Sequence, residues 1–152
     1  MQDPDLSLLI KAARKAGELA KNYDFKRLKV WEKEAAAGPV TEADIEIDRM
    51  LFQYLTAARP DYGWLCEEST HDFPHYEKAC SFVIDPIDGT RDFIKGGNNW
   101  AHSFAVVKNG KVSAAVVYVP RQDLLFAAYR GGGSWLNGER IQTKAINTTG
   151  EF

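Results

Sequence analysis

Residues 82–90 read Phe-Val-Ile-Asp-Pro-Ile-Asp-Gly-Thr, an apolar run that ends in two carboxylates three positions apart. The apolar run predicts a buried β-strand, and the Asp-Pro and Asp-Gly dipeptides after it predict a turn. Pro86 fixes the backbone between the carboxylates, while Gly89 permits a close approach or an unusual dihedral angle. We expect Thr90 to cap a short helix that begins at Arg91, whose first N–H groups would face an anion. This stretch therefore predicts a strand that delivers two acidic side chains to a turn.

Two helices are predicted upstream of this strand. The first covers about residues 4–23, with Asp3 as its N-cap and apolar residues at helical spacing. The second begins at Thr41, where Asp44 three positions later forms an acidic variant of the capping box. Asp44 also lies at the head of the apolar stripe of this helix, where a carboxylate needs an explanation.

Most of the remaining chain predicts β-strands joined by short turns. Alternating or apolar runs predict strands at residues 28–33, 63–66, 81–85, 102–108, 111–119 and 124–129, with a mobile loop at 34–39. Asn109-Gly110 is a strong two-residue hairpin signal, and Asn137-Gly138 predicts another turn. Such connections favour antiparallel pairing. We therefore predict a layered α+β fold in which two N-terminal helices pack on a largely antiparallel sheet.

The composition of the 152-residue chain excludes several classes of protein. Hydrophobic residues make up 45% and charged residues 26%, as in ordinary globular domains, and a net charge of -2 lacks the basic footprint of nucleic-acid binders. The apolar stretch at 114–119 is far shorter than the ~20 residues of a membrane helix. Two cysteines argue against a disulfide framework, and residues 1–5 do not resemble a secretory signal, so a cytoplasmic location is expected.

The acidic turn has the residue types that a hard cation prefers. Mg²⁺ binds carboxylate, carbonyl and water oxygens, which Asp85, Asp88 and the carbonyl of Ile87 can supply from one turn. A helix start beside them can hold a phosphate while cations bridge its oxygens, the arrangement for metal-assisted phosphoryl transfer to water. The simpler alternative is that both carboxylates only form turns.

Two other acidic positions favour the metal interpretation. Glu67 and Glu68 directly follow the strand predicted at 63–66, so a second strand also ends in carboxylates. Asp44 adds a third carboxylate on the buried side of a helix. Each has a simpler explanation by itself, because an acidic pair can lie in a solvated loop and Asp44 can be a helix cap.

Three segments together resemble the inositol monophosphatase family. They are Val-Thr-Glu-Ala-Asp at 40–44, Trp-Leu-Cys-Glu-Glu-Ser at 64–69 and Asp-Pro-Ile-Asp-Gly-Thr-Arg-Asp-Phe at 85–93, and they occur in the family's order and spacing. The resemblance extends from the first helix to about Ile141. It implies a lithium-sensitive, Mg²⁺-dependent phosphatase whose chain here corresponds to the first half of an αβαβα sandwich.

The resemblance also implies a role for each matching residue. Glu67, Asp85 and the Ile87 carbonyl would bind a first Mg²⁺, and Asp85 and Asp88 would share a second. Glu67 would also contact a third, weaker cation.

The same resemblance implies a catalytic group beside the metals. Thr90 and Asp44 would orient and deprotonate the attacking water, with Glu67 as a further catalytic residue through its metal. The backbone N–H groups of Gly89 and Thr90 would hold the phosphate.

The sequence departs from the family pattern in one respect. Members are typically longer, and their second half supplies a Trp-Asp motif whose aspartate completes the second metal site. None of the four tryptophans here precedes an aspartate. We therefore expect residues 1–152 to be the N-terminal part, with the C-terminal half absent, an incomplete second metal site and little activity alone. An uncovered apolar face would favour homo-oligomers.

The leading hypothesis is a Mg²⁺-dependent phosphate monoester hydrolase that acts on inositol monophosphate or another small phosphate. Residues 91–94, Arg-Asp-Phe-Ile, are also similar to relatives acting on 3'-phosphoadenosine 5'-phosphate or histidinol phosphate. A 3'(2'),5'-bisphosphate nucleotidase and a histidinol-phosphate phosphatase are therefore alternatives. A non-enzymatic alternative is an inactive fragment that binds metal. We expect neither a nucleic-acid polymer nor a membrane as a partner.

Overall fold

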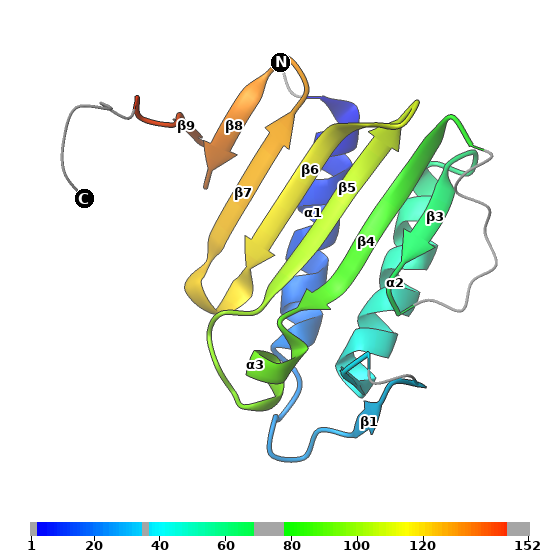
Figure 1. Ribbon diagram of the computed structural model, residues 1–152, viewed down its shortest axis with the longest axis vertical. Helices are drawn as coiled ribbons and strands as arrows, with labels where there is room; N and C mark the ends of the chain where they lie inside the picture. The colour runs from blue at the N-terminus through cyan, green and yellow to red at the C-terminus, as the bar shows by residue number, and fades with distance from the viewer. Residues whose placement is uncertain (1–2, 35–36, 69–77, 146–152) are drawn as a thin grey trace.

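The computed structural model describes residues 3–34, 37–68 and 78–145 of the chain. Two long helices, α1 (Pro4–Ala20) and α2 (Glu42–Ala58), lie on one side of a seven-stranded sheet with the order β3-β4-β5-β6-β7-β8-β9 (Figure 1). These strands are β3 (Gly63–Cys66), β4 (Cys80–Asp88), β5 (Ala101–Lys108), β6 (Lys111–Val119), β7 (Leu124–Tyr129), β8 (Gly133–Leu136) and β9 (Glu139–Ile141). The predicted α+β layered fold is confirmed.

Both helices begin where their capping residues predicted. Asp3 accepts hydrogen bonds from the backbone N–H groups of Asp5 and Leu6 at the start of α1. At α2, the backbone N–H of Thr41 donates to Asp44 Oδ2 at 2.8 Å, and the backbone N–H of Asp44 donates to Thr41 Oγ1 at 3.2 Å. These reciprocal bonds satisfy N–H groups that the helix itself leaves unpaired.

The sheet is antiparallel except for one pair of strands. β3 and β4 run parallel, with Cys66 opposite Ile84, while every other neighbouring pair is antiparallel. Parallel strands end at the same edge of a sheet, so the residues that follow β3 and β4 meet there. Figure 1 shows both arrows pointing to the end of the sheet where α3 (Thr90–Ile94) lies.

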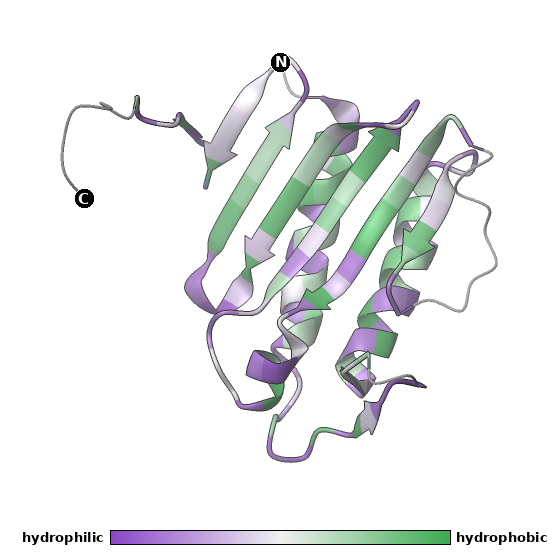
Figure 2. Ribbon diagram, in the orientation of Figure 1, coloured by the Kyte–Doolittle hydropathy of each residue, from purple (hydrophilic) through white to green (hydrophobic). Residues whose placement is uncertain are grey.

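The two faces of the sheet differ in what covers them. Phe82, Phe104 and Val116 point toward the helices and are buried. The alternate positions point to the other face, where Val117 and Phe126 are each 37% exposed. Figure 2 shows hydrophobic residues along most of the central strands, which supply both faces. The apolar face expected from the sequence is therefore present. In the described part of the chain, no helix is long and apolar enough to cross a membrane.

The structure corrects three local predictions. α1 ends at Ala20 rather than near residue 23. Residues Pro39–Thr41, of which Pro39 was predicted to lie in a loop, form strand β2, which pairs with β1 (Val30–Glu32). Residues 35–36 of that predicted loop lie outside the described residues. β4 continues beyond residue 85 to Asp88, because an irregular stretch lets pairing with β5 resume after Asp85.

Candidate functional site

The ends of β3 and β4 form one wall of a pocket of about 300 Å³. Six of the residues predicted for the site line it: Glu67, Asp85, Ile87, Asp88, Gly89 and Thr90. Lys33 and Gly38, which follow β1 and precede β2, and Pro39 at the start of β2 also line this pocket. Parallel pairing explains why Glu67 and Asp85, far apart in sequence, lie side by side.

A bulge in β4 places Asp85 and Asp88 on the same face of the sheet. Residues three positions apart on a regular strand point to opposite faces. Here Asp85 pairs with Ser103 and Asp88 with Ala101, so three steps along β4 oppose only two along β5. The extra residue restores the alternation and turns both carboxylates toward one side.

Asp85 is the most strongly perturbed carboxyl of the pocket. Burial raises its pKa to about 7, and the neighbouring negative charges of Glu67 and Asp88 act in the same direction. Its Oδ1 atom is buried and accepts no hydrogen bond from any described residue. A buried acceptor without a donor destabilises the fold. A cation bound beside Asp85 would relieve both effects.

Lys33 is a pocket residue that the sequence analysis did not single out. Its Nζ lies 3.2 Å from Glu67 Oε1 and 2.5 Å from Glu68 Oε1. Burial alone would lower the pKa of Lys33, but the bonds to Glu68 and Glu67 outweigh it and raise the pKa. Nothing in the local sequence distinguishes this lysine from a solvated one, because its partners lie more than thirty positions away.

Asp44 lies behind the pocket rather than in its lining. It is fully buried, and Thr90 Oγ1 lies 3.2 Å from Asp44 Oδ1 and 3.1 Å from the Ile87 carbonyl oxygen. Burial raises the pKa of Asp44, while hydrogen bonds from Thr41 and Thr90 oppose that rise. The prediction that Thr90 caps the short helix was wrong, because Gly89 is the N-cap of α3 and has a φ of 86°. Thr90 instead links Asp44 to the acidic turn.

The oxygen atoms of the pocket fit a hydrated Mg²⁺ better than a closed metal cage. Within the described ranges, no three His, Cys, Asp or Glu side chains are grouped so that they could hold a metal ion. Mg²⁺ usually keeps several waters and binds one or two carboxylates together with phosphate oxygens. The unpaired Asp85 oxygen, the exposed Asp88 and the Ile87 carbonyl meet that requirement.

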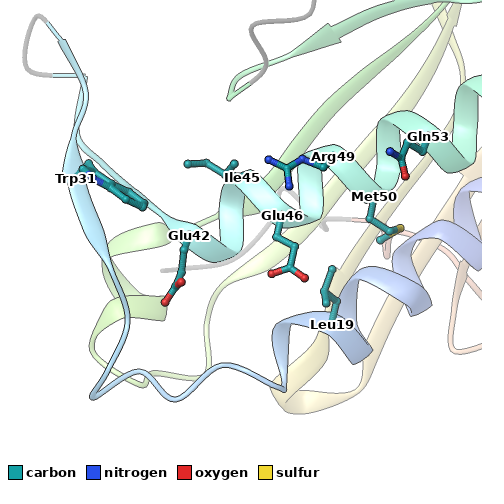
Figure 3. A pocket seen from close by; sticks show the side chains of 8 residues that line it. All are labelled: Leu19, Trp31, Glu42, Ile45, Glu46, Arg49, Met50 and Gln53. Carbon is teal, nitrogen blue, oxygen red and sulfur yellow. The ribbon is translucent and has the colours of Figure 1, made fainter.

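A larger pocket of about 520 Å³ lies on the outer side of α2 (Figure 3). Figure 3 shows Glu42 and Glu46 along the helix, with Trp31 at one end. None of the predicted site residues lines this pocket. Pocket volume therefore does not identify the candidate site. The smaller pocket at the acidic turn is the candidate because the predicted residues line it.

Comparison with known proteins agrees with this geometry. A model of the inositol monophosphatase family matches residues 1–151. The chain belongs to that family. This confirms the family that was inferred from the three sequence segments.

Individual members of the family show how much of the chain is shared. The inositol-1-monophosphatase of Rhizobium meliloti is 36% identical over 142 residues, which cover 92% of this chain and 53% of the relative. The histidinol-phosphatase of Chlorobaculum parvum is 37% identical over 144 residues, covering 94% and 54%. The crystal structure of the extragenic suppressor protein suhB from Bartonella henselae has a TM-score of 0.86 at 34% identity, covering 95% and 56%. The chain thus spans about half the length of these inositol monophosphatase relatives.

Proposed function

We propose that residues 1–152 form the metal-binding part of a Mg²⁺-dependent phosphate monoester hydrolase. The observation that carries this proposal is the buried, unpaired Asp85 oxygen beside Glu67 and Asp88 at the pocket. An unpaired carboxylate oxygen among like charges destabilises the fold unless a cation compensates it. Membership in a family named for a phosphatase supports the same reaction class.

Each residue around the pocket would have its own role in hydrolysis. When bound, Mg²⁺ supplies positive charge to the phosphate oxygens and lowers the pKa of a water. Asp85, Asp88 and the Ile87 carbonyl would hold it, with Glu67 as a further ligand. Thr90 Oγ1 would orient the attacking water and accept its proton, while the Thr90 hydroxyl proton passes to Asp44 Oδ1 across their 3.2 Å contact. The N–H groups of Gly89 and Thr90, two residues of the pocket lining, would hold the phosphate.

The sequence identities to relatives named for two different substrates are nearly equal, so they do not indicate which substrate this chain takes. A relative named inositol-1-monophosphatase and one named histidinol-phosphatase are 36% and 37% identical to this chain. We take a small polar phosphate monoester, such as inositol monophosphate or histidinol phosphate, as the primary substrate class.

One residue favours a second candidate, a substrate with two phosphates. The exposed side chain of Arg91 lines the pocket next to Gly38. The guanidinium lies so close to this glycine that a Cβ atom at position 38 would be 3.4 Å from Arg91 Nη2. Its guanidinium forms no ion pair with any residue that the structure describes. A guanidinium binds phosphate with two parallel hydrogen bonds. Arg91 therefore supports the 3'(2'),5'-bisphosphate nucleotidase alternative.

The reaction is tested first by metal binding and then by turnover. Isothermal titration of the chain with MgCl₂ should show binding that Asp85→Asn weakens by about 100-fold. Because the curated relatives are longer, phosphate release is measured with the chain alone and mixed with the C-terminal half of the Rhizobium relative. We expect little turnover alone and hydrolysis in the mixture. Magnesium binding without turnover in either sample would favour the non-enzymatic alternative, and no magnesium binding would overturn the proposal.

The substrate class is tested with a matched pair of ligands. Adenosine 3',5'-bisphosphate and adenosine 3'-monophosphate share one phosphate and differ only in the second. If Arg91 binds a second phosphate, Arg91→Gln reduces the preference for the bisphosphate by about tenfold, the effect of one charge-assisted hydrogen bond. Lys95→Gln at the end of α3, outside the pocket lining, is the control. If Arg91→Gln leaves the preference for the bisphosphate over the monophosphate unchanged, the substrate class is a simple phosphate monoester.

A further inference from the structure

His102 is a fully buried histidine directly behind the candidate site. It lies on β5 between Ala101 and Ser103, the two residues that pair with the ends of the β4 bulge. Its Nδ1 lies 2.5 Å from the carbonyl oxygen of Pro86, inside the bulge. Its Nε2 is also buried and contacts no hydrogen-bond donor or acceptor within the described residues.

The tautomer of this imidazole follows from its partner. A carbonyl oxygen can only accept, so Nδ1 carries the hydrogen and donates it to Pro86. Burial lowers the pKa of His102 to about 4, although the Pro86 bond opposes that shift, and the ring is neutral near pH 7. Nε2 is then an acceptor without a donor, which destabilises the fold. An apolar ring at this position would avoid that penalty.

The hydrogen bond from His102 to the Pro86 carbonyl oxygen can stabilise the bulge of β4. Pro86 has no N–H to donate to the strand ladder, so the sheet alone constrains it weakly. If the bulge slipped into regular pairing, Asp85 and Asp88 would point to opposite faces of the sheet. The hydrogen bond from His102 fixes the peptide that lies between the two carboxylates.

We propose that His102 is a positioning residue that holds the β4 bulge and thereby keeps Asp85 and Asp88 on one face for a shared Mg²⁺. The inference rests on the proposed magnesium function of those carboxylates. His102 acts through Pro86 and contacts neither metal nor substrate. Groups that position metal ligands in this way commonly change metal affinity by 10- to 100-fold.

A packing role for the ring is the competing explanation. His102 lies among aromatic rings, with centroid distances of 5.6 Å to Trp100 and 6.1 Å to Phe104. His102→Phe would keep an aromatic ring there and remove the donor. His102→Asn would keep a donor near the place of Nδ1, whereas His102→Gln would move it outward toward the place of Nε2.

The experiment measures magnesium affinity and bulge geometry in the same variants. Isothermal titration with MgCl₂ should give about tenfold weaker binding for His102→Phe and His102→Gln, and near-normal binding for His102→Asn. The cross-strand NOE between Asp88 and Ala101 should be lost in the first two variants and kept in the third, whereas the NOE between Asp85 and Ser103, on the regular side of the bulge, should remain in all three. Phe104→Leu, on the same face of β5, is the control that lowers unfolding stability in urea without changing either readout.

The outcomes separate this inference from the proposed function. His102→Phe with normal magnesium affinity and an intact bulge would overturn it, as would a Phe104→Leu variant that weakens binding equally. If the Phe variant does not fold, the contrast between Asn and Gln decides the question. If the wild-type chain binds no magnesium, the proposed function fails, and the NOEs still show whether His102 holds the bulge.

Discussion

Asp5 is buried as a whole residue, Asp85 is buried at its Oδ1 atom, and the two carboxylates differ in the donors that surround them. Asp5, on α1, accepts bonds at 2.9 Å from Arg59, Tyr62 and Lys108. Burial would raise the pKa of Asp5, but these bonds outweigh it and lower the pKa. Asp85 has no such donors and lies beside two other carboxylates.

The difference shows which carboxylate has its negative charge compensated by other residues of the chain. The Asp5 cluster joins α1 to the end of α2 and to β5 with charges that the chain itself supplies. The acidic turn lacks that compensation, apart from Lys33 on Glu67 and Glu68. A carboxylate that is buried without its own cation is suited to bind one from solution. We infer that Asp5 serves stability and Asp85 serves binding.

The largest expected effect comes from neutralising Asp5. Asp5→Asn removes the negative charge that compensates Arg59 and Lys108 and turns one of the two acceptor oxygens into an NH₂ donor, so we expect the free energy of unfolding to fall by about 2 to 3 kcal/mol. Urea denaturation followed by circular dichroism measures it. Magnesium affinity of the folded variant should stay within twofold of wild type. A loss below 0.5 kcal/mol, the order of a surface pair, would refute the structural role.

The same chemical change at Asp85 should act in the opposite direction. Asp85→Asn removes a buried charge that repels Glu67 and Asp88, so unfolding stability without metal should stay equal or rise. Magnesium affinity should fall by about 100-fold, the upper range for disturbed metal sites. Calorimetry and urea denaturation on one preparation give both values. Comparable destabilisation in the two Asn variants would erase the contrast between the sites.

The pH dependence should also differ between the two carboxylates. The pKa of Asp85 is raised to about 7 in the fold, so its ionisation makes the metal-free chain less stable as pH rises from about 4 to 7. The pKa of Asp5 is lowered, so its contribution is present above pH 4 and lost as pH falls further.

The magnesium affinity should depend on pH because Asp85 titrates near pH 7 in the fold. Binding must displace the Asp85 proton, so affinity should increase by up to about tenfold per pH unit below pH 7 and level off above it. Calorimetric titrations at pH 5.5, 6.5, 7.5 and 8.5 would detect this. Flat affinity across that range would mean that Asp85 is already ionised in the metal-free chain.

The smallest expected effect tests how redundant the Asp5 cluster is. Lys108 is partly exposed, and its side chain retains 39% of its accessible surface. Lys108→Met leaves Asp5 with the Arg59 and Tyr62 bonds, so we expect a loss of only about 0.5 to 1 kcal/mol in urea denaturation. A loss as large as that of Asp5→Asn would show that Lys108 alone compensates the carboxylate.

The local features of the fold could be predicted because each is encoded within a few residues. The two residues of the capping box, Thr41 and Asp44, are three positions apart, and the Asn109-Gly110 turn has positive φ angles of 49° and 76°, as such a hairpin requires. The residues of the acidic turn were also recognisable, because their order and spacing resemble a family. Long-range partners were not recognisable, since Lys108 is 103 positions from Asp5.

The sequence by itself determined the helices, most strands, the family and the set of acidic residues, because capping, alternation and motif spacing act over short distances. The tertiary structure alone decided how those residues meet. Parallel pairing of β3 with β4 brings Glu67 to Asp85, and the bulge opposite His102 turns Asp85 and Asp88 to one face. Strand register and side-chain environment depend on neighbours distant in the chain, so local patterns do not specify them.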